Sequence, residues 1–351
     1  MPESCLLRLP LGEDCLETFN FEKAVCNHGF FMMSPNIWFP CTKTLKRPLR
    51  LANSVSSVIV SISHPPNTTS LLINVHGSDD HLQLSVDDRH AILAQVARML
   101  RISDRDVKDI KEFHQIHSEA KQRCFGRIFR SPSLFEDAVK SILLCNCTWS
   151  RTLNMARALC NLHRELSNGS SCNIHLLLKS GTSERKEVKR KQPEAFAPTS
   201  VYKSNLKGDE LSVIGNFPTA RELASLSTKF LNERCNLGYR ARTISNLAKG
   251  VEKGTINLND HFGDEGTIYD KTWTQLTKIK GVGPFSRANI LMCIGFYQTI
   301  PSDTETIRHI KEHGQVHGRE SCNKQTVEKD VEEIYEKYAP YQSLLRSCSK
   351  L

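Results

Sequence analysis

The spacing of apolar residues changes along this chain, and that change limits the folds it can adopt. Within residues 18–95, apolar residues form β-branched runs or alternate with a period of two, at 58–62, 71–75 and 82–86. A turn signal at 77–80 separates the last two runs, and a helix is expected at 89–100. From about residue 112 the spacing becomes that of amphipathic helices. The sequence therefore predicts a mainly α fold preceded by an α+β part with an antiparallel sheet.

The second part of the chain contains several helix signals. Ser133 and Glu136 have the spacing of a capping box, and a turn at Asn146 precedes a further helix that begins near Trp149. Apolar periodicity predicts later helices at 218–232, 239–252, 272–279, 285–296, 304–313 and 325–337.

Residues 165–212 interrupt this pattern with polar residues and a basic run at 185–191. We interpret the segment as a disordered insertion. The basic run is either a nuclear import signal, which favours a nuclear location, or a solvated linker.

Charge and cysteine content narrow the class of protein. The chain of 351 residues has a formal net charge of +9, which favours an anionic partner and nucleic acid first. No apolar run reaches the roughly 18 residues that a membrane helix needs, so no membrane partner is expected. The 13 cysteines are scattered without any C-x-x-C pair, and no secretory signal is recognisable. We expect a reduced intracellular protein without structural zinc.

A glycine-rich turn joins two of the predicted helices. Thr272 is a plausible N-cap of the first helix, and residues 280–284 read Lys-Gly-Val-Gly-Pro. Gly281 and Gly283 permit positive φ and a close approach of the backbone to a partner, and Pro284 suits the first position of the next helix. Amides at such a turn and helix N-terminus bind phosphate without reading base sequence. The alternative is an ordinary helical hairpin with a glycine turn.

An aspartate follows this turn at a defined distance. Asp303 lies 20 residues after Gly283, where a new helix is predicted to begin. A carboxylate there can stabilise the positive charge that develops on a deoxyribose as its base departs, and it can orient water. The alternative interpretation is that Asp303 or Ser302 only caps the helix.

Segment 276–308, with Pro301 and Asp303, resembles the helix-hairpin-helix (HhH-GPD) DNA glycosylase superfamily. Residues 237–242 (Leu-Gly-Tyr-Arg-Ala-Arg) are similar to a stretch of its 8-oxoguanine branch, and the resemblance covers residues 20–160 and 215–342. It implies a sheet domain followed by two helical subdomains with a DNA cleft between them. It also implies that the target base is flipped out of the duplex and that Asp303 is catalytic.

The resemblance also implies how the duplex is held. Asn146 would fill the vacated position, Tyr239 would wedge the neighbouring base step, and Arg151 and Arg240 would contact the orphaned base. Turn formation, packing and phosphate binding are the alternative roles of these side chains. The full set of predicted DNA-binding residues is Asn146, Arg151, Tyr239, Arg240, Lys280, Gly281, Val282, Gly283 and Arg287.

The chain departs from the family pattern at the hairpin. Two branches place a Schiff-base lysine two residues after the second hairpin glycine, but this chain has Phe285, as in the 3-methyladenine branch, which carries an aromatic residue there. We therefore predict an enzyme without lyase activity. The final family helix is shortened here, because the chain ends soon after residues 338–343, which resemble its start.

No cofactor is predicted. Only Cys322 and Cys348 lie where some family members bind an iron–sulfur cluster with four thiolates. His309, His313 and His317 have helical spacing but fall short of a four-ligand zinc site. A monovalent cation held by hairpin carbonyls would fit the family.

These observations predict residues 1–110 as the α+β domain and 111–164 with 213–343 as the helical core, split by the insertion 165–212 and followed by a tail at 344–351. The predicted function is a monofunctional DNA glycosylase that acts on an alkylated or otherwise damaged base. The expected partner is double-stranded DNA with a damaged or mispaired base, bound by a monomer. The alternatives are a catalytically silent DNA-binding protein of the same fold, and a bifunctional glycosylase-lyase that uses Lys280.

Overall fold

The computed structural model describes residues 5–76, 83–167, 215–258, 265–312 and 321–348. Several sequence predictions lie outside these ranges: the turn at 77–80, the insertion beyond residue 167 with its basic run, His313, His317, and the end of the tail.

An antiparallel sheet forms the N-terminal part of the molecule, as predicted, and it has five strands. Strands β2 (Ile37–Phe39), β3 (Thr44–Arg50), β4 (Ser57–Ser63) and β5 (Ser70–His76) form a meander. Strand β1 (Cys5–Pro10) pairs with β5, which gives the order β1-β5-β4-β3-β2.

The prediction of a strand at 82–86 is wrong for residues 83–86, which the structure describes. Residues 83–85 belong to no strand, and Val86 begins helix α3 (Val86–Leu100). The Ser85 hydroxyl accepts a hydrogen bond from the Asp88 amide, and the Asp88 carboxylate accepts one from the Ser85 amide. This capping box starts the helix three residues earlier than the predicted start, so a local capping signal outweighed the alternating pattern.

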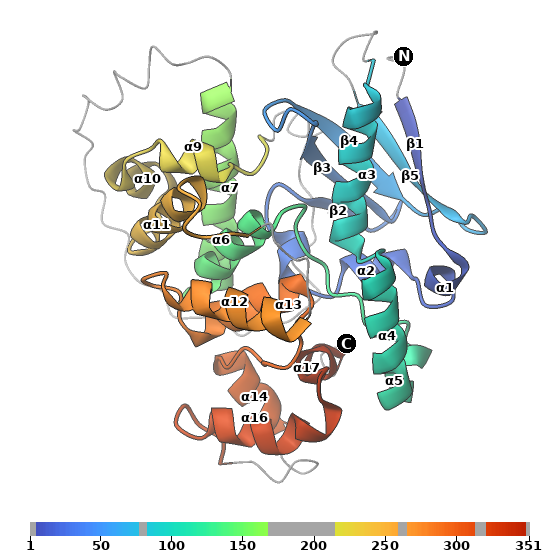
Figure 1. Cartoon of the computed structure of the whole chain (residues 1–351), viewed down its shortest axis with the longest axis vertical. Coiled ribbons are helices and arrows are strands. Elements are labelled where there is room, and N and C mark those ends of the chain that lie inside the picture. Colours follow the sequence, from blue (N-terminus) through green and yellow to red (C-terminus); the bar gives the residue numbers. More distant parts are fainter. Residues whose placement is uncertain (1–4, 77–82, 168–214, 259–264, 313–320, 349–351) are drawn as a thin grey trace.

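Helix α3 lies across the sheet (Figure 1). Alternate side chains of the strands, among them Leu45, Val60 and Ile73, point toward the helix side and are fully buried. Helix α3 contributes Ile92 and Val96 to the same core cluster, which continues into the helical part of the chain. The sheet and helices α6 to α13 therefore share one apolar core, and the helices near the C-terminus pack in two smaller clusters.

Helices make up the rest of the molecule. Their bounds are α1 (Glu13–Leu16), α2 (Phe21–Val25), η1 (Gly29–Met32), α4 (Asp104–Ile116), α5 (Ser118–Gln122), α6 (Leu134–Leu144), α7 (Trp149–Ser167), α9 (Ala220–Ala224), α10 (Thr228–Cys235), α11 (Arg240–Glu252), α12 (Glu265–Thr277), α13 (Pro284–Ile294), α14 (Thr304–Glu312), α16 (Val327–Tyr335), η3 (Glu336–Tyr338) and α17 (Gln342–Cys348). None of the helices within the described ranges has the length and apolarity needed to cross a bilayer.

Two helix predictions need correction. The helix expected at 218–232 is two helices, because the Ser227 hydroxyl accepts from the Phe230 amide and starts α10 anew. Thr272 is not an N-cap, since α12 begins at Glu265 and Thr272 is buried within it. Helix α4 also runs across the domain boundary expected at residues 110 and 111.

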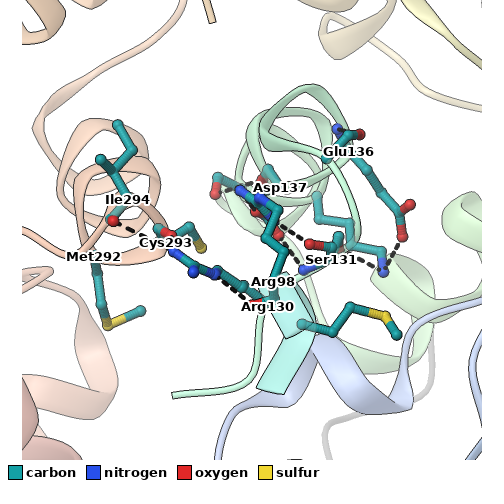
Figure 2. A network of polar contacts seen from close by, with 12 residues as sticks. Arg98, Arg130, Ser131, Glu136, Asp137, Met292, Cys293 and Ile294 are labelled. Atoms are coloured by element: carbon teal, nitrogen blue, oxygen red, sulfur yellow. Dashed lines mark hydrogen bonds and ion pairs between the residues drawn. The ribbon is translucent and has the colours of Figure 1, made fainter. Parts of the chain in front are cut away.

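A buried ionic network joins the sheet to helix α6, and Figure 2 shows its part around Glu136 and Asp137 of α6. Ser133 caps α6 as predicted, but the Glu136 side chain does not return to complete the capping box. It pairs instead with Arg47 on β3 at 3.0 Å and with Lys140 on α6 at 2.7 Å. A buried carboxylate is stable only with such partners, so the tertiary ion pair outweighed the local cap.

Two buried arginines hold the C-terminal end of α13. Arg101 donates to the Met292 carbonyl at 2.6 Å, and Arg130 donates to the Cys293 carbonyl at 2.9 Å (Figure 2 shows the latter). Asp106 pairs with both guanidinium groups. Burial lowers the pKa of Arg130 to about 10, so it stays charged at neutral pH. Cations at the C-terminal end of α13 interact favourably with the helix dipole and anchor that end of the helix. The N-terminal end of α13, at the glycine turn, is the opposite end.

Candidate nucleic-acid interface

The turn between α12 and α13 is packed against α11. Gly281 has φ +98°, and a Cβ built on it would lie 2.2 Å from Thr243 Oγ1 of α11, so only glycine fits. Gly283 differs from the prediction, because its φ of −85° is open to any residue and a Cβ there would meet nothing within 4 Å. The first glycine serves the fold of the turn, while the second leaves its surface open.

Backbone amides line the exposed side of this turn. Pro284 occupies the first turn of α13 and Gly283 is its N-cap without a capping side chain, as predicted. The Val282 amide is bonded to the Ile279 carbonyl at 3.0 Å, and the Val282 side chain is buried. Within the described residues, the amides of Gly281, Gly283 and Phe285 have no protein acceptor. Together with the exposed Lys280, they form a surface on which an anion can bind.

The α6–α7 turn and the start of α11 are held together by hydrogen bonds. Asn146 is exposed in this turn with φ 45°. The carbonyl of Cys145 accepts from the Tyr239 hydroxyl at 3.2 Å and from the Arg240 guanidinium, which also donates to the Asn146 carbonyl at 3.2 Å. Tyr239 remains 58% exposed, whereas Arg240 is only 1% exposed. Arg240 therefore shapes the turn that presents Asn146.

The same turn also contacts the glycine hairpin. Cys145 Sγ lies 2.8 Å from Ser286 Oγ in the first turn of α13. Through this contact, and through Gly281 against Thr243, the Asn146 turn, the start of α11 and the hairpin pack against one another. Cys145, Ser286 and Thr243 were not predicted as site residues, because no motif or spacing distinguishes them from ordinary helix residues.

Two further arginines of the prediction lie on α7 and α13. Arg151 is exposed on α7, and its guanidinium donates to the Asn236 carbonyl at 3.5 Å. The Arg287 guanidinium is placed over the Trp273 ring at 4.7 Å, which holds it against α12.

Asp303 caps helix α14. Its Oδ1 accepts from the Thr306 amide at 2.7 Å and lies 2.9 Å from the Thr306 hydroxyl. The Arg346 guanidinium of α17 lies 3.6 Å from the same oxygen. All these contacts are to Oδ1, and Oδ2 accepts no hydrogen bond within the described ranges. The side chain is 33% exposed, so the capping role foreseen as the alternative is real and still leaves one oxygen open.

Comparisons with known proteins place this geometry in a known fold. No protein-family model matches the sequence, and no curated protein sequence matches it. Among solved structures, however, 73 chains match. The 3-methyladenine DNA-glycosylase from Archaeoglobus fulgidus is 16% identical with a TM-score of 0.60, and the likeness covers 97% of this chain and 98% of that one. MBOgg1 in complex with a low-affinity DNA ligand is 15% identical with a TM-score of 0.55, over 99% and 96% of the two chains.

A third relative in fold is the Clostridium acetobutylicum 8-oxoguanine glycosylase/lyase. Its apo-form is 14% identical with a TM-score of 0.52, over 92% of this chain and 91% of that one. This chain has the fold of a DNA glycosylase. The likeness includes the N-terminal sheet, whereas the sequence resemblance began only at residue 20.

Within the DNA glycosylase fold, the described C-terminal residues form a docked helix. Leu344 of α17 is fully buried, and the Ser343 amide donates to the Tyr297 carbonyl at 2.9 Å. The stretch expected at 338–343 to open a final helix thus leads into α17, which brings Arg346 to Asp303. No sequence signal linked these two residues, which lie far apart along the chain.

No metal site stands out in the part of the chain that the structure describes, where no group of three or more His, Cys, Asp or Glu side chains is arranged to hold an ion. His309 is buried on α14, and its helical neighbour His313 lies outside the described residues.

Proposed function

We propose that this protein is a monofunctional DNA glycosylase that hydrolyses the N-glycosidic bond of a damaged, most readily an alkylated, base in double-stranded DNA. One observation carries the proposal: the hairpin, the Asn146 turn and Tyr239 come from three separate helix pairs but meet through Cys145 and Thr243. Open amides, an exposed lysine and an exposed tyrosine on these packed elements suit a phosphate backbone and a disrupted base stack.

In the proposed reaction, the hairpin holds the backbone while the target nucleotide leaves the stack. The amides of Gly281 and Gly283 and the Lys280 ammonium bind phosphate, and α13 adds its dipole. Asn146 and Tyr239 occupy the space that the base vacates. These contacts are independent of sequence, as a lesion-searching enzyme requires.

Asp303 carries the chemical step of the proposal. Its Oδ2 would stand beside the anomeric carbon, stabilise the oxocarbenium-like charge as the base departs, and orient the water that attacks. Phe285 occupies the position where an amine nucleophile would be needed for strand cleavage, so water completes the reaction and leaves an abasic site.

The protein would act as a monomer in the nucleus, without an iron–sulfur cluster. A monovalent cation at the hairpin would be held by the carbonyls of Lys280 and Val282, which accept no hydrogen bond within the described residues.

The test is an excision assay on a panel of duplexes with methylated, deaminated or oxidised bases, followed by alkali. We expect alkali-dependent breaks with wild-type protein and none with Asp303→Asn. Asparagine caps a helix as well as aspartate does, so this variant keeps the cap of α14, and thermal unfolding checks its fold. Asp87→Asn, at an exposed carboxylate of α3, is the matched control and should cleave like the wild type.

A catalytically silent DNA-binding protein is the second candidate, because Asp303 Oδ1 is already engaged by a cap and a cation. Intact strands on every duplex, together with normal DNA binding, would support it. A covalent adduct trapped by borohydride would instead indicate lyase chemistry at Lys280, and we expect no adduct.

A further inference from the structure

A buried cation stands behind the carboxylate of Asp303. Arg346 on α17 donates to Thr306 Oγ1 at 2.8 Å, and its Nη2 lies 3.6 Å from Asp303 Oδ1. The Arg346 side chain is 9% exposed, against 33% for Asp303. The guanidinium therefore lies on the protein side of the carboxylate, and the carboxylate itself reaches solvent.

The hydroxyl of Thr306 connects the two charged groups. It lies 2.8 Å from the Pro301 carbonyl and 2.9 Å from Asp303 Oδ1, and it has a single proton to donate. A guanidinium has only donors, so Thr306 must accept from Arg346 with a lone pair. Arg346 thus turns the hydroxyl proton away from itself and toward the two acceptors, one of which is the carboxylate.

The burial of Arg346 costs free energy that packing alone does not explain. Its Nε has no hydrogen-bond partner within the described residues, which makes the burial costly. Burial lowers the pKa of Arg346, and the nearby Asp303 charge raises it and offsets part of that effect. Leu344 and Leu345 already fill the apolar contacts of α17, so space-filling alone does not call for a guanidinium.

We propose that Arg346 is a positioning residue for the glycosylase reaction. It holds the Asp303 carboxylate by Oδ1, directly through charge and indirectly through the Thr306 hydroxyl, and so leaves Oδ2 free for the sugar. This inference rests on the proposed function, and it adds that helix α17 completes the catalytic site.

The test compares two substitutions of Arg346 with one of a neighbouring arginine. Single-turnover excision is measured on a duplex that the wild type processes, and the dissociation constant is measured on the same duplex. We expect Arg346→Met to lower the excision rate about 10- to 100-fold with little change in affinity, because small misplacements of a reacting group cost this much. Arg346→Lys should recover part of the rate. Arg308→Met, on the exposed side of α14, should match the wild type.

A second pair of variants reports on the same link without changing a charge. Thr306→Ser keeps the hydroxyl and should keep the rate, whereas Thr306→Val removes it at equal size and should lower the rate.

Each outcome decides the matter. Thermal unfolding identifies any variant that fails to fold, and the Arg346→Lys and Thr306 pairs then carry the test. The positioning role would be overturned if Arg346→Met excised the base at the wild-type rate, or if it lost excision rate and DNA affinity by the same factor. The proposed function would remain intact in both cases. An inactive wild type on every lesion would overturn both.

Discussion

Replacing Gly283 by alanine tests the proposed phosphate contact without disturbing the conformation of the hairpin. Gly283 has φ −85° and ψ −177°, which alanine adopts without strain, and its Cβ would meet nothing within 4 Å. The only cost to the fold is a weaker N-cap, about 0.5–1 kcal/mol. The methyl group would stand where a phosphate must approach the Gly283 amide. We expect the affinity for duplex DNA to fall about tenfold, which corresponds to about 1.4 kcal/mol.

Gly281→Ala is the matched contrast. A side chain at φ +98° costs about 1–2 kcal/mol, and the 2.2 Å approach to Thr243 Oγ1 adds an overpacking cost of about 1–3 kcal/mol. The sum, roughly 2–5 kcal/mol, is a large share of the roughly 5–15 kcal/mol that stabilises a typical domain. Gly281→Ala should lose DNA binding together with much of its thermal stability, whereas Gly283→Ala should lose binding with only the small loss of stability that its weaker N-cap causes.

The assay is fluorescence anisotropy of a labelled duplex at several salt concentrations, with thermal unfolding in parallel. Lys280→Met should reduce the slope of log affinity against log salt by about 0.9, because one cation–phosphate contact is lost. Gly283→Ala should leave that slope unchanged, because an amide releases no counterion. Wild-type affinity of Gly283→Ala at every salt concentration would refute the assignment of the turn as a phosphate site.

Three further predictions test the rest of the framework. Burial would raise the pKa of Glu136, but Arg47 and Lys140 hold it at about 2. The ionised Glu136 therefore stabilises the folded state fully above the unfolded pKa of about 4.3, and this stabilisation is lost as the pH falls toward 2. Glu136→Gln should therefore flatten the acid limb of stability measured by urea unfolding; an unchanged limb would contradict the pairing. Tyr239→Ala should weaken binding to an abasic-site duplex by about 1–3 kcal/mol and Tyr239→Phe far less, if the ring stacks on bases; equal losses would refute a wedge. Arg130→Met should cost about 3–5 kcal/mol in denaturant unfolding, because Asp106 loses a buried partner; a loss below the lower figure would show that Arg101 suffices.

The features that the sequence predicted correctly are those whose partners lie within a few residues. Pro284 at the first turn of α13, the positive φ of Gly281 and the cap at Asp303 all follow from local backbone chemistry. Helical and alternating periods likewise located most helices and two of the five strands, β4 and β5, since burial of one face is a local pattern. The strand expected at 82–86 failed where two local signals competed, and the cap at Ser85 was the stronger.

Only the tertiary structure decided which distant residues share a site. Glu136 had the spacing to close a capping box but pairs with Arg47, 89 positions away, because a buried carboxylate gains more from a cation than from an amide. Cys145 meets Ser286 across 141 positions, and Arg346 meets Thr306 across 40. Such pairs form only when helices pack against one another. The residues that meet in this way follow no repeating pattern in the sequence. The chain alone therefore determined the hairpin and the aspartate, while the packing of its helices determined what surrounds them.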